Sequence, residues 1–233
     1  MTTGPTSDRP TPDPHADAPL RRAGPPIESA AGVLVLLHGR GATAESILGL
    51  HEALAIRSLA AIAPQASDNT WYPLSFLAPL DSNQPHLDSA LARVESIVRD
   101  VLAAGVPSER IALLGFSQGA CLACESAARH PRHYGALIAL TGGLIGPDGT
   151  ARRYPGSLDG TPVFLASGDP DAHVPFARVR ETADVLVRMG AKVELRRYPG
   201  MPHTINNEEL AAARDSLQRM VKDGAAGPSG ARP

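Results

Sequence analysis

A chain of 233 residues is long enough for one domain with a sizeable hydrophobic core, and its composition is that of a soluble globular protein. The formal net charge of −2 gives no basis for binding nucleic acid or anionic membranes, and no apolar run approaches the roughly 20 residues that span a bilayer. The first residues lack the apolar core of a signal peptide, so we expect a cytoplasmic protein without stable membrane insertion.

The two ends of the chain differ in composition from its middle. Residues 1–28 are rich in Pro, Asp and Thr and show no hydrophobic periodicity, so we expect a disordered Pro-rich tail there. Residues 224–233 have the same character and are expected to form a second disordered tail. The remaining residues, 29–223, are expected to form a single domain.

Short apolar runs alternate with amphipathic segments along this domain. In chain order, the runs that predict strands are residues 32–37, 59–64, 110–117, 135–143, 161–168 and 192–200. The segments that predict helices are residues 43–55, 87–102, 118–130, 175–190 and 206–221. Most of the strands are apolar throughout, which is typical of a parallel sheet covered by helices on both faces. We therefore predict an α/β domain with a mainly parallel sheet of about six or seven strands.

The two cysteines, Cys121 and Cys124, form a CxxC pair inside the expected helix 118–130. Such a pair can be a redox or metal motif, but this one lies in an apolar stretch with no second CxxC or histidine pair. We expect two buried core thiols, and redox chemistry is the alternative. No other metal-ligand spacing is present, so neither a metal nor an organic cofactor is expected.

The segment GFSQG, residues 115–119, follows a buried run and precedes a helical one. It is either an ordinary turn or a strained strand-to-helix corner that exposes the Ser117 hydroxyl as a nucleophile. A neutral serine hydroxyl needs a base within hydrogen-bond reach, and the base needs a carboxylate that fixes its tautomer. The loops after the later strands supply Asp171 as the expected acid and His203 as the expected base.

These three side chains come in the order serine, acid, histidine, which is the order of the α/β-hydrolases. Because the carboxyl ends of parallel strands meet at one edge of a sheet, we expect the three to converge, and this favours the corner over the turn. In the loop of the acid, Asp169 is the alternative carboxylate and His173 the alternative base. We expect His38 to brace a neighbouring loop rather than to perform chemistry.

Several motifs together resemble the phospholipase/carboxylesterase family, which includes the acyl-protein thioesterases. They span residues 30–222 and read LLHGRGA, APQA followed by WYP, GFSQGA, GDPDAHVP and YPGMPHTI. The resemblance implies an α/β-hydrolase fold with Ser117, Asp171 and His203 as catalytic triad. It also implies an oxyanion hole made by the backbone N–H groups of Arg40 and Gln118, whose side chains would then not matter. The chain has HGRGA where the thioesterase branch usually has HGLGD, and other segments look closer to bacterial esterases.

The irregular segment after the second strand carries Trp71, Tyr72 and Phe76, three of the nine aromatic residues of the chain. We expect these side chains to line an acyl or aryl pocket, together with Gly143 and Leu144 at another strand end. The alternative is that the aromatic residues only pack the loop onto the core.

The expected function is hydrolysis of carboxylic esters, or thioesters, of small or medium acyl or aryl groups through an acyl-enzyme on Ser117. Lysophospholipase, acyl-protein thioesterase or dienelactone-type hydrolase activity are alternatives, as is acyl transfer to an acceptor other than water. A non-catalytic binding protein on the same fold is a further alternative. A small-molecule ester is the expected partner, and we expect a monomer or homodimer.

Overall fold

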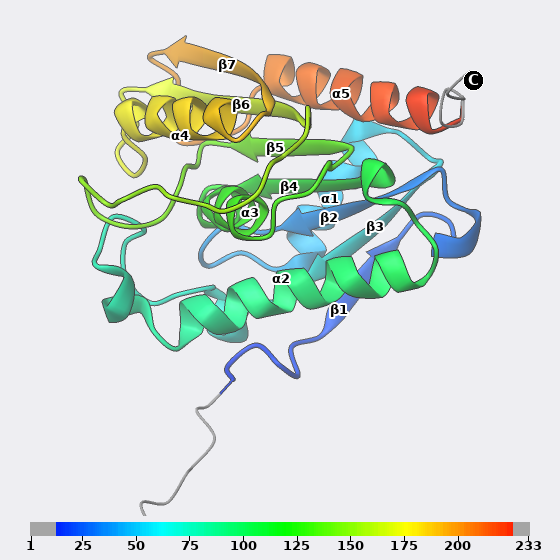
Figure 1. The fold of residues 1–233 in the computed structure, drawn as a ribbon, viewed down its shortest axis with the longest axis horizontal. Coiled ribbons are helices and arrows are strands. Elements are labelled where there is room, and N and C mark those ends of the chain that lie inside the picture. The colour runs from blue at the N-terminus through cyan, green and yellow to red at the C-terminus, as the bar shows by residue number, and fades with distance from the viewer. Residues whose placement is uncertain (1–12, 226–233) are drawn as a thin grey trace, which may run out of the picture.

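Seven strands form one sheet in the computed structural model, which describes residues 13–225 (Figure 1). They are β1 (Leu20–Ala23), β2 (Gly32–Leu37), β3 (Leu59–Pro64), β4 (Ile111–Phe116), β5 (Ala136–Leu140), β6 (Pro162–Asp169) and β7 (Lys192–Pro199). Their order across the sheet is β1-β3-β2-β4-β5-β6-β7, and β1 is antiparallel to its neighbour while all other pairs are parallel. The prediction of a mainly parallel sheet of six or seven strands is confirmed.

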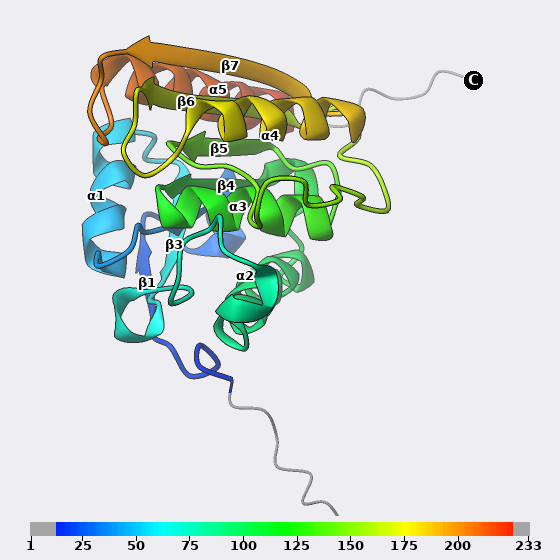
Figure 2. The ribbon, with the colours of Figure 1, turned by 90° about the vertical axis from the view of Figure 1, so that its left-hand side faces the viewer.

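Helices cover both faces of this sheet, as Figure 2 shows. They are α1 (Ala44–Leu54), α2 (His86–Ala103), α3 (Gln118–Arg129), α4 (Phe176–Arg188) and α5 (Asn207–Ala225). Side chains of β2 alternate between two cores. Val33, Val35 and Leu37 belong to the core that also contains residues of α2, α3 and α4, whereas Leu34 and Leu36 belong to the core that contains residues of α1 and α5. This alternation explains why β2 is apolar throughout, since neither of its faces meets water. In the described part of the chain, none of the helices is long and apolar enough to cross a bilayer.

The N-terminal segment is a correction to the expected tail, because residues 13–28 belong to the fold. Strand β1 pairs with β3, and the His15 side chain is fully buried. One ring nitrogen of His15 accepts the Ser67 N–H at 3.1 Å, and the other lies 3.0 Å from the Trp71 carbonyl oxygen. The segment escaped prediction because its two central side chains are exposed arginines, so β1 is held by backbone hydrogen bonds and has no apolar run.

Most of the remaining residues of the two expected tails are not described by the structure. Residues 1–12 and 226–233, where disorder was expected, lie outside the part of the chain that the structure describes. The last helix continues to Ala225, two residues beyond the expected domain end at 223.

Both cysteines are buried free thiols on α3, as expected. Burial raises the pKa of the Cys121 thiol to about 12. At neutral pH this sulfur is therefore a thiol and not a reactive thiolate, which argues against redox chemistry.

Candidate active site

The serine lies at the sharp turn between β4 and α3, as the motif predicts. Ser117 has φ 55° and ψ −120°, a conformation that non-glycine residues rarely adopt. A Cβ at Gly115 would overlap the backbone of Gly119, and a Cβ at Gly119 would overlap the Leu37 carbonyl of β2. Both glycines are thus required by close backbone contact, and the segment is the strained corner rather than an ordinary turn.

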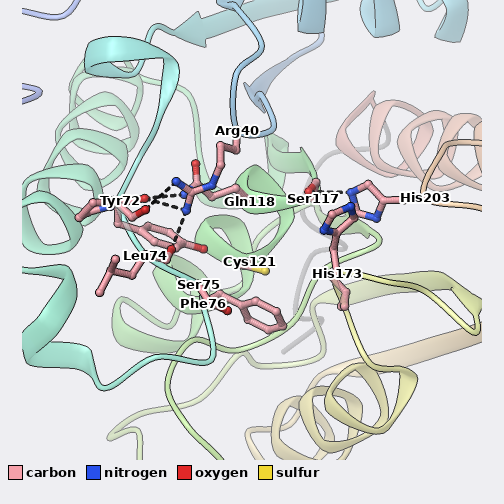
Figure 3. Close-up of a pocket in the computed structure, with 12 residues that line it drawn as sticks. Arg40, Tyr72, Leu74, Ser75, Phe76, Ser117, Gln118, Cys121, His173 and His203 are labelled. Carbon is pink, nitrogen blue, oxygen red and sulfur yellow. Dashed lines mark hydrogen bonds between the residues drawn. The ribbon is translucent and has the colours of Figure 1, made fainter.

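A continuous chain of hydrogen bonds joins the three predicted side chains. His203 Nε2 lies 2.9 Å from Ser117 Oγ, and His203 Nδ1 lies 2.8 Å from Asp171 Oδ2. Asp171 follows β6 and His203 follows β7, so the three residues come from the carboxyl ends of three strands of the sheet. Figure 3 shows the histidine ring directed at the serine.

The acid is held as a carboxylate by its surroundings. Burial raises the pKa of Asp171, but hydrogen bonds from the backbone N–H groups of Val174 and His173 and from the His203 ring outweigh it and lower the pKa below its usual value. Both backbone bonds end on Oδ1 at 2.8 Å, which leaves Oδ2 for the histidine. An ionised Asp171 accepts a hydrogen bond from the Nδ1–H of His203, so Nε2 carries no proton and can accept a hydrogen bond from the serine hydroxyl.

The two alternatives in the acid loop occupy other positions. Asp169 forms an ion pair with Arg197, with 2.6 Å between carboxylate oxygen and Nε. The His173 ring packs edge-on against the His203 ring, with 4.7 Å between the ring centres, and makes no hydrogen bond to Ser117. The structure therefore brings Asp171 and His203 to the serine, and not Asp169 or His173.

The turn after β2 approaches the serine from the other side. A Cβ at Gly39 would lie 3.4 Å from Ser117 Cβ, so this backbone rests against the nucleophile corner. His38 braces the turn as expected: its Nδ1 lies 2.8 Å from the Gly39 oxygen, and its Nε2 accepts the Ala66 N–H at 3.0 Å. Burial lowers the pKa of His38, which keeps the ring neutral and able to accept that bond.

Two backbone N–H groups beside the serine have no partner. Within residues 13–225, neither Arg40 N–H nor Gln118 N–H donates a hydrogen bond to another group of the chain. Donors left free in this way, one just after the serine and one in the turn beside it, suit an oxygen that gains negative charge at the reacting carbon.

A cavity of about 410 Å³ opens at the serine. Its walls are formed by Arg40, Tyr72, Pro73, Leu74, Ser75, Phe76, Ser117, Gln118, Cys121, His173, Val174 and His203. Tyr72 and Phe76 are therefore wall residues, as the sequence predicts (Figure 3). The Tyr72 side chain is at the same time fully buried and part of the core behind the wall. Arg40, Ser117, Gln118 and His203 were predicted site residues as well, and His173 was the alternative base. Pro73, Leu74 and Ser75 were not predicted, because a loop without periodicity does not show in sequence which of its residues face inward.

Three expected pocket residues lie elsewhere, and this corrects the prediction for them. Trp71 is fully buried and its Nε1–H donates to the His38 carbonyl at 2.8 Å, so it packs the loop onto the core. Leu144 is also fully buried and donates its N–H to Thr182 Oγ1 at 2.9 Å, while the Gly143 N–H lies 3.5 Å from the Cys121 sulfur. None of the three is among the residues that line the cavity.

The side chains of Arg40 and Gln118, which were expected not to matter, both bond the loop that forms the cavity wall. Gln118 Nε2 donates to the Tyr72 carbonyl at 2.8 Å, and its Oε1 accepts the Trp71 N–H at 3.0 Å. Arg40 donates to backbone carbonyls of the same loop. Sequence reasoning missed these contacts because any residue type can supply a backbone carbonyl.

No metal site accompanies the serine. Among residues 13–225 there is no group of three or more His, Cys, Asp or Glu side chains that could hold a metal ion.

Comparison with known proteins gives the family and the fold of the chain. Residues 22–221 match the model of the phospholipase/carboxylesterase family. A probable carboxylesterase SOBER1-like protein of Arabidopsis thaliana is 26% identical over 84% of this chain and 81% of its own length. Acyl-protein thioesterase 1 of Yarrowia lipolytica is 25% identical over 66% of this chain and 70% of its own length. The crystal structure of a phospholipase/carboxylesterase from Dyadobacter fermentans superposes with a TM-score of 0.84 at 45% identity, covering 87% of this chain and 97% of that one.

Proposed function

Because the chain belongs to the phospholipase/carboxylesterase family, we propose that it hydrolyses carboxylic esters with Ser117 as nucleophile, His203 as general base and acid, and Asp171 as orienting carboxylate. Family membership makes the chain a serine hydrolase of ester or thioester bonds. The observation that supports the three roles is the unbroken chain of hydrogen bonds from Ser117 Oγ to the Asp171 carboxylate.

Acylation is the first half of the reaction. Ser117 Oγ attacks the carbonyl carbon of the ester while His203 Nε2 takes the hydroxyl proton. The carbonyl oxygen becomes an oxyanion and accepts hydrogen bonds from the N–H groups of Arg40 and Gln118, which have no other partner in residues 13–225. The C–O bond to the alcohol then breaks, and His203 returns the proton to the departing oxygen, so an acyl-enzyme and a free alcohol result.

Deacylation repeats these steps with water. Water gives a proton to His203 Nε2 and adds to the acyl carbon, and the second oxyanion is bound by the same two N–H groups. Collapse releases the carboxylic acid and returns the proton to Ser117. The residues named here complete the cycle as a simple hydrolysis, with no group consumed besides water.

The test is covalent labelling together with turnover. A fluorophosphonate probe should label the wild-type protein at Ser117 and should fail to label Ser117→Ala. Turnover of p-nitrophenyl acetate should fall by about 10⁶ in that variant, because the serine and the histidine act as a unit. Ser96→Ala is the matched control, since Ser96 is an exposed serine of α2. Normal turnover by Ser117→Ala would contradict the proposal.

The substrate class is proposed from the cavity. A volume of about 410 Å³ is within the range of about 300–1,000 Å³ that small-molecule sites occupy, so we propose small or medium acyl or aryl groups. Thioesters are the second candidate, because one of the relatives is named an acyl-protein thioesterase. Matched oxygen esters and thioesters of the same acids, assayed with lysophospholipids and lactones, would rank these classes by kcat/KM.

Location and assembly complete the proposal. A cytoplasmic location is supported by the two buried, unpaired cysteines, which agree with a reducing compartment. A monomer or homodimer is proposed as the assembly. Cell fractionation and sedimentation of the purified protein would test the two statements.

A further inference from the structure

We propose that Arg40 is a positioning residue that governs which acyl groups the cavity accepts. In this inference the Arg40 guanidinium holds the turn Tyr72–Leu74 in place as a wall of the cavity. The inference rests on the proposed function of the same site, since the cavity is taken to receive the acyl or aryl group of the substrate.

Three consecutive carbonyls converge on this one guanidinium. Arg40 Nη1 donates to the Pro73 oxygen at 2.8 Å, and Nη2 donates to the oxygens of Tyr72 at 2.9 Å and Leu74 at 2.6 Å (Figure 3). The planar fork of arginine suits such a set of acceptors, whereas the compact ammonium of lysine cannot reach all three in the same geometry.

The charge of Arg40 has no other use in the described chain. Within residues 13–225, no carboxylate forms an ion pair with Arg40. Hydrogen bonds that involve a charged donor are stronger than those between neutral groups. All hydrogen bonds that the Arg40 guanidinium donates within residues 13–225 therefore go to the turn Tyr72–Leu74.

The exposed end of this turn, Pro73 and Leu74, has few other supports. It contains no regular secondary structure, and its tip residue Leu74 is 47% exposed. Apart from Arg40, its Tyr72 end is held by the buried Tyr72 side chain and by the Gln118 amide and the Thr70 hydroxyl, which donate to the Tyr72 carbonyl at 2.8 and 3.0 Å. Its Leu74 end is held by the Leu74 N–H, which donates to Asn83 Oδ1 at 2.8 Å. Removing the guanidinium therefore leaves the exposed end of the turn with one hydrogen bond.

The same two residues thus serve the reacting oxygen and the cavity wall. The proposed oxyanion donors are the N–H groups of Arg40 and Gln118, and the side chains of both bond the Tyr72 carbonyl. The position of the wall is therefore fixed relative to the reacting carbon. An acyl group that fills the cavity up to the turn Tyr72–Leu74 depends on this spacing, whereas an acetyl group is too short to use it.

The experiment compares two esters in matched variants. We would measure kcat/KM for p-nitrophenyl butyrate and p-nitrophenyl acetate in the wild type, Arg40→Lys, Arg40→Met and Arg57→Met. Arg57 is an exposed arginine whose side chain makes no hydrogen bond or ion pair within residues 13–225, so its variant is the control for loss of an arginine. All values would be divided by the fraction of protein that a fluorophosphonate titrates.

We expect the ratio of kcat/KM for the butyrate ester to kcat/KM for the acetate ester to fall about tenfold in Arg40→Met, because hydrogen bonds to a charged group are lost. The fall should be smaller in Arg40→Lys. Arg40→Ala, measured with the same two esters, should lose the ratio as Arg40→Met does, and added methylguanidinium should restore part of it by occupying the vacated place. Equal losses for both esters, with no rescue, would overturn the inference.

A second readout does not depend on turnover. Trp71 is the single tryptophan of the chain, is fully buried, and directly precedes the turn. Acrylamide should quench its fluorescence more strongly in Arg40→Met than in the wild type and in Arg57→Met. Unchanged quenching would overturn the proposed hold on the turn. A wild-type protein that no fluorophosphonate labels would instead contradict the proposed function, while the quenching would still test the role of Arg40.

Discussion

Replacing the carboxylate at position 171 by an amide tests whether Asp171 orients His203 in the proposed mechanism. Asp171 Oδ1 accepts two backbone N–H groups, from His173 and Val174, each at 2.8 Å, and Oδ2 accepts from His203 Nδ1 at 2.8 Å. In Asp171→Asn the amide can keep only one of these arrangements. If its oxygen stays on the two backbone donors, its NH₂ group faces Nδ1.

The structure decides between the two orientations. The flipped amide would leave two backbone donors unpaired, and at about 1 kcal/mol for each lost hydrogen bond this costs roughly 2 kcal/mol. The amide NH₂ therefore points at His203, so Nδ1 must be the acceptor and the ring proton moves to Nε2. In that tautomer Nε2 donates to Ser117 and cannot take its proton. We expect kcat to fall by about 10⁴ with little change in fold, as in other serine hydrolases whose histidine is held in the wrong tautomer.

The assay is turnover of p-nitrophenyl acetate at neutral pH, with the thermal midpoint measured on the same protein. Asp169→Asn is the matched control: it removes only a partly exposed ion pair with Arg197, and such pairs contribute at most about 1 kcal/mol. We expect this control to keep activity within a few-fold of the wild type. Activity of Asp171→Asn within tenfold of the wild type, or an equal loss in Asp169→Asn, would refute the reasoning.

Three further predictions concern stability and reactivity. Gly119→Ala should destabilise the fold by about 1–3 kcal/mol in urea unfolding, because its Cβ would overlap the Leu37 carbonyl. Gly49→Ala on α1 is the control: its Cβ meets no atom within 4 Å, so this variant should be neutral or stabilising. Burial lowers the pKa of His15, so the folded state favours the neutral ring; its stabilisation is complete above the unfolded pKa of about 6.5 and is lost as pH falls. Urea unfolding of His15→Gln should then change less between pH 7.5 and 5.5 than that of the wild type, and an equal change would contradict this. Cys121, with a pKa of about 12, should resist iodoacetamide in the folded protein at pH 8 and react once the protein is unfolded, as mass spectrometry would show.

The sequence by itself predicts the architecture and the three side chains that form the hydrogen-bonded chain of the site. Apolar runs mark β2 to β6 because parallel strands covered on both faces cannot expose a polar side chain on either. The edge strand β7 is marked instead by alternation of half-buried and exposed residues. The polar residues at the ends of those strands, Ser117, Asp171 and His203, converge because a parallel sheet places its carboxyl ends at one edge. Even the corner is readable, since its two glycines are the residues that a close backbone approach requires.

Only the tertiary structure decides how the site is enclosed. Strand β1 is held by backbone hydrogen bonds and carries exposed arginines, so hydrophobicity does not mark it. Trp71 and Tyr72 are both fully buried, yet only Tyr72 belongs to the cavity wall, and this difference depends on what packs against the loop. The bonds from Arg40 to three carbonyls have no signature in sequence, because every residue type carries the same acceptor and only the fold determines which carbonyls come within reach.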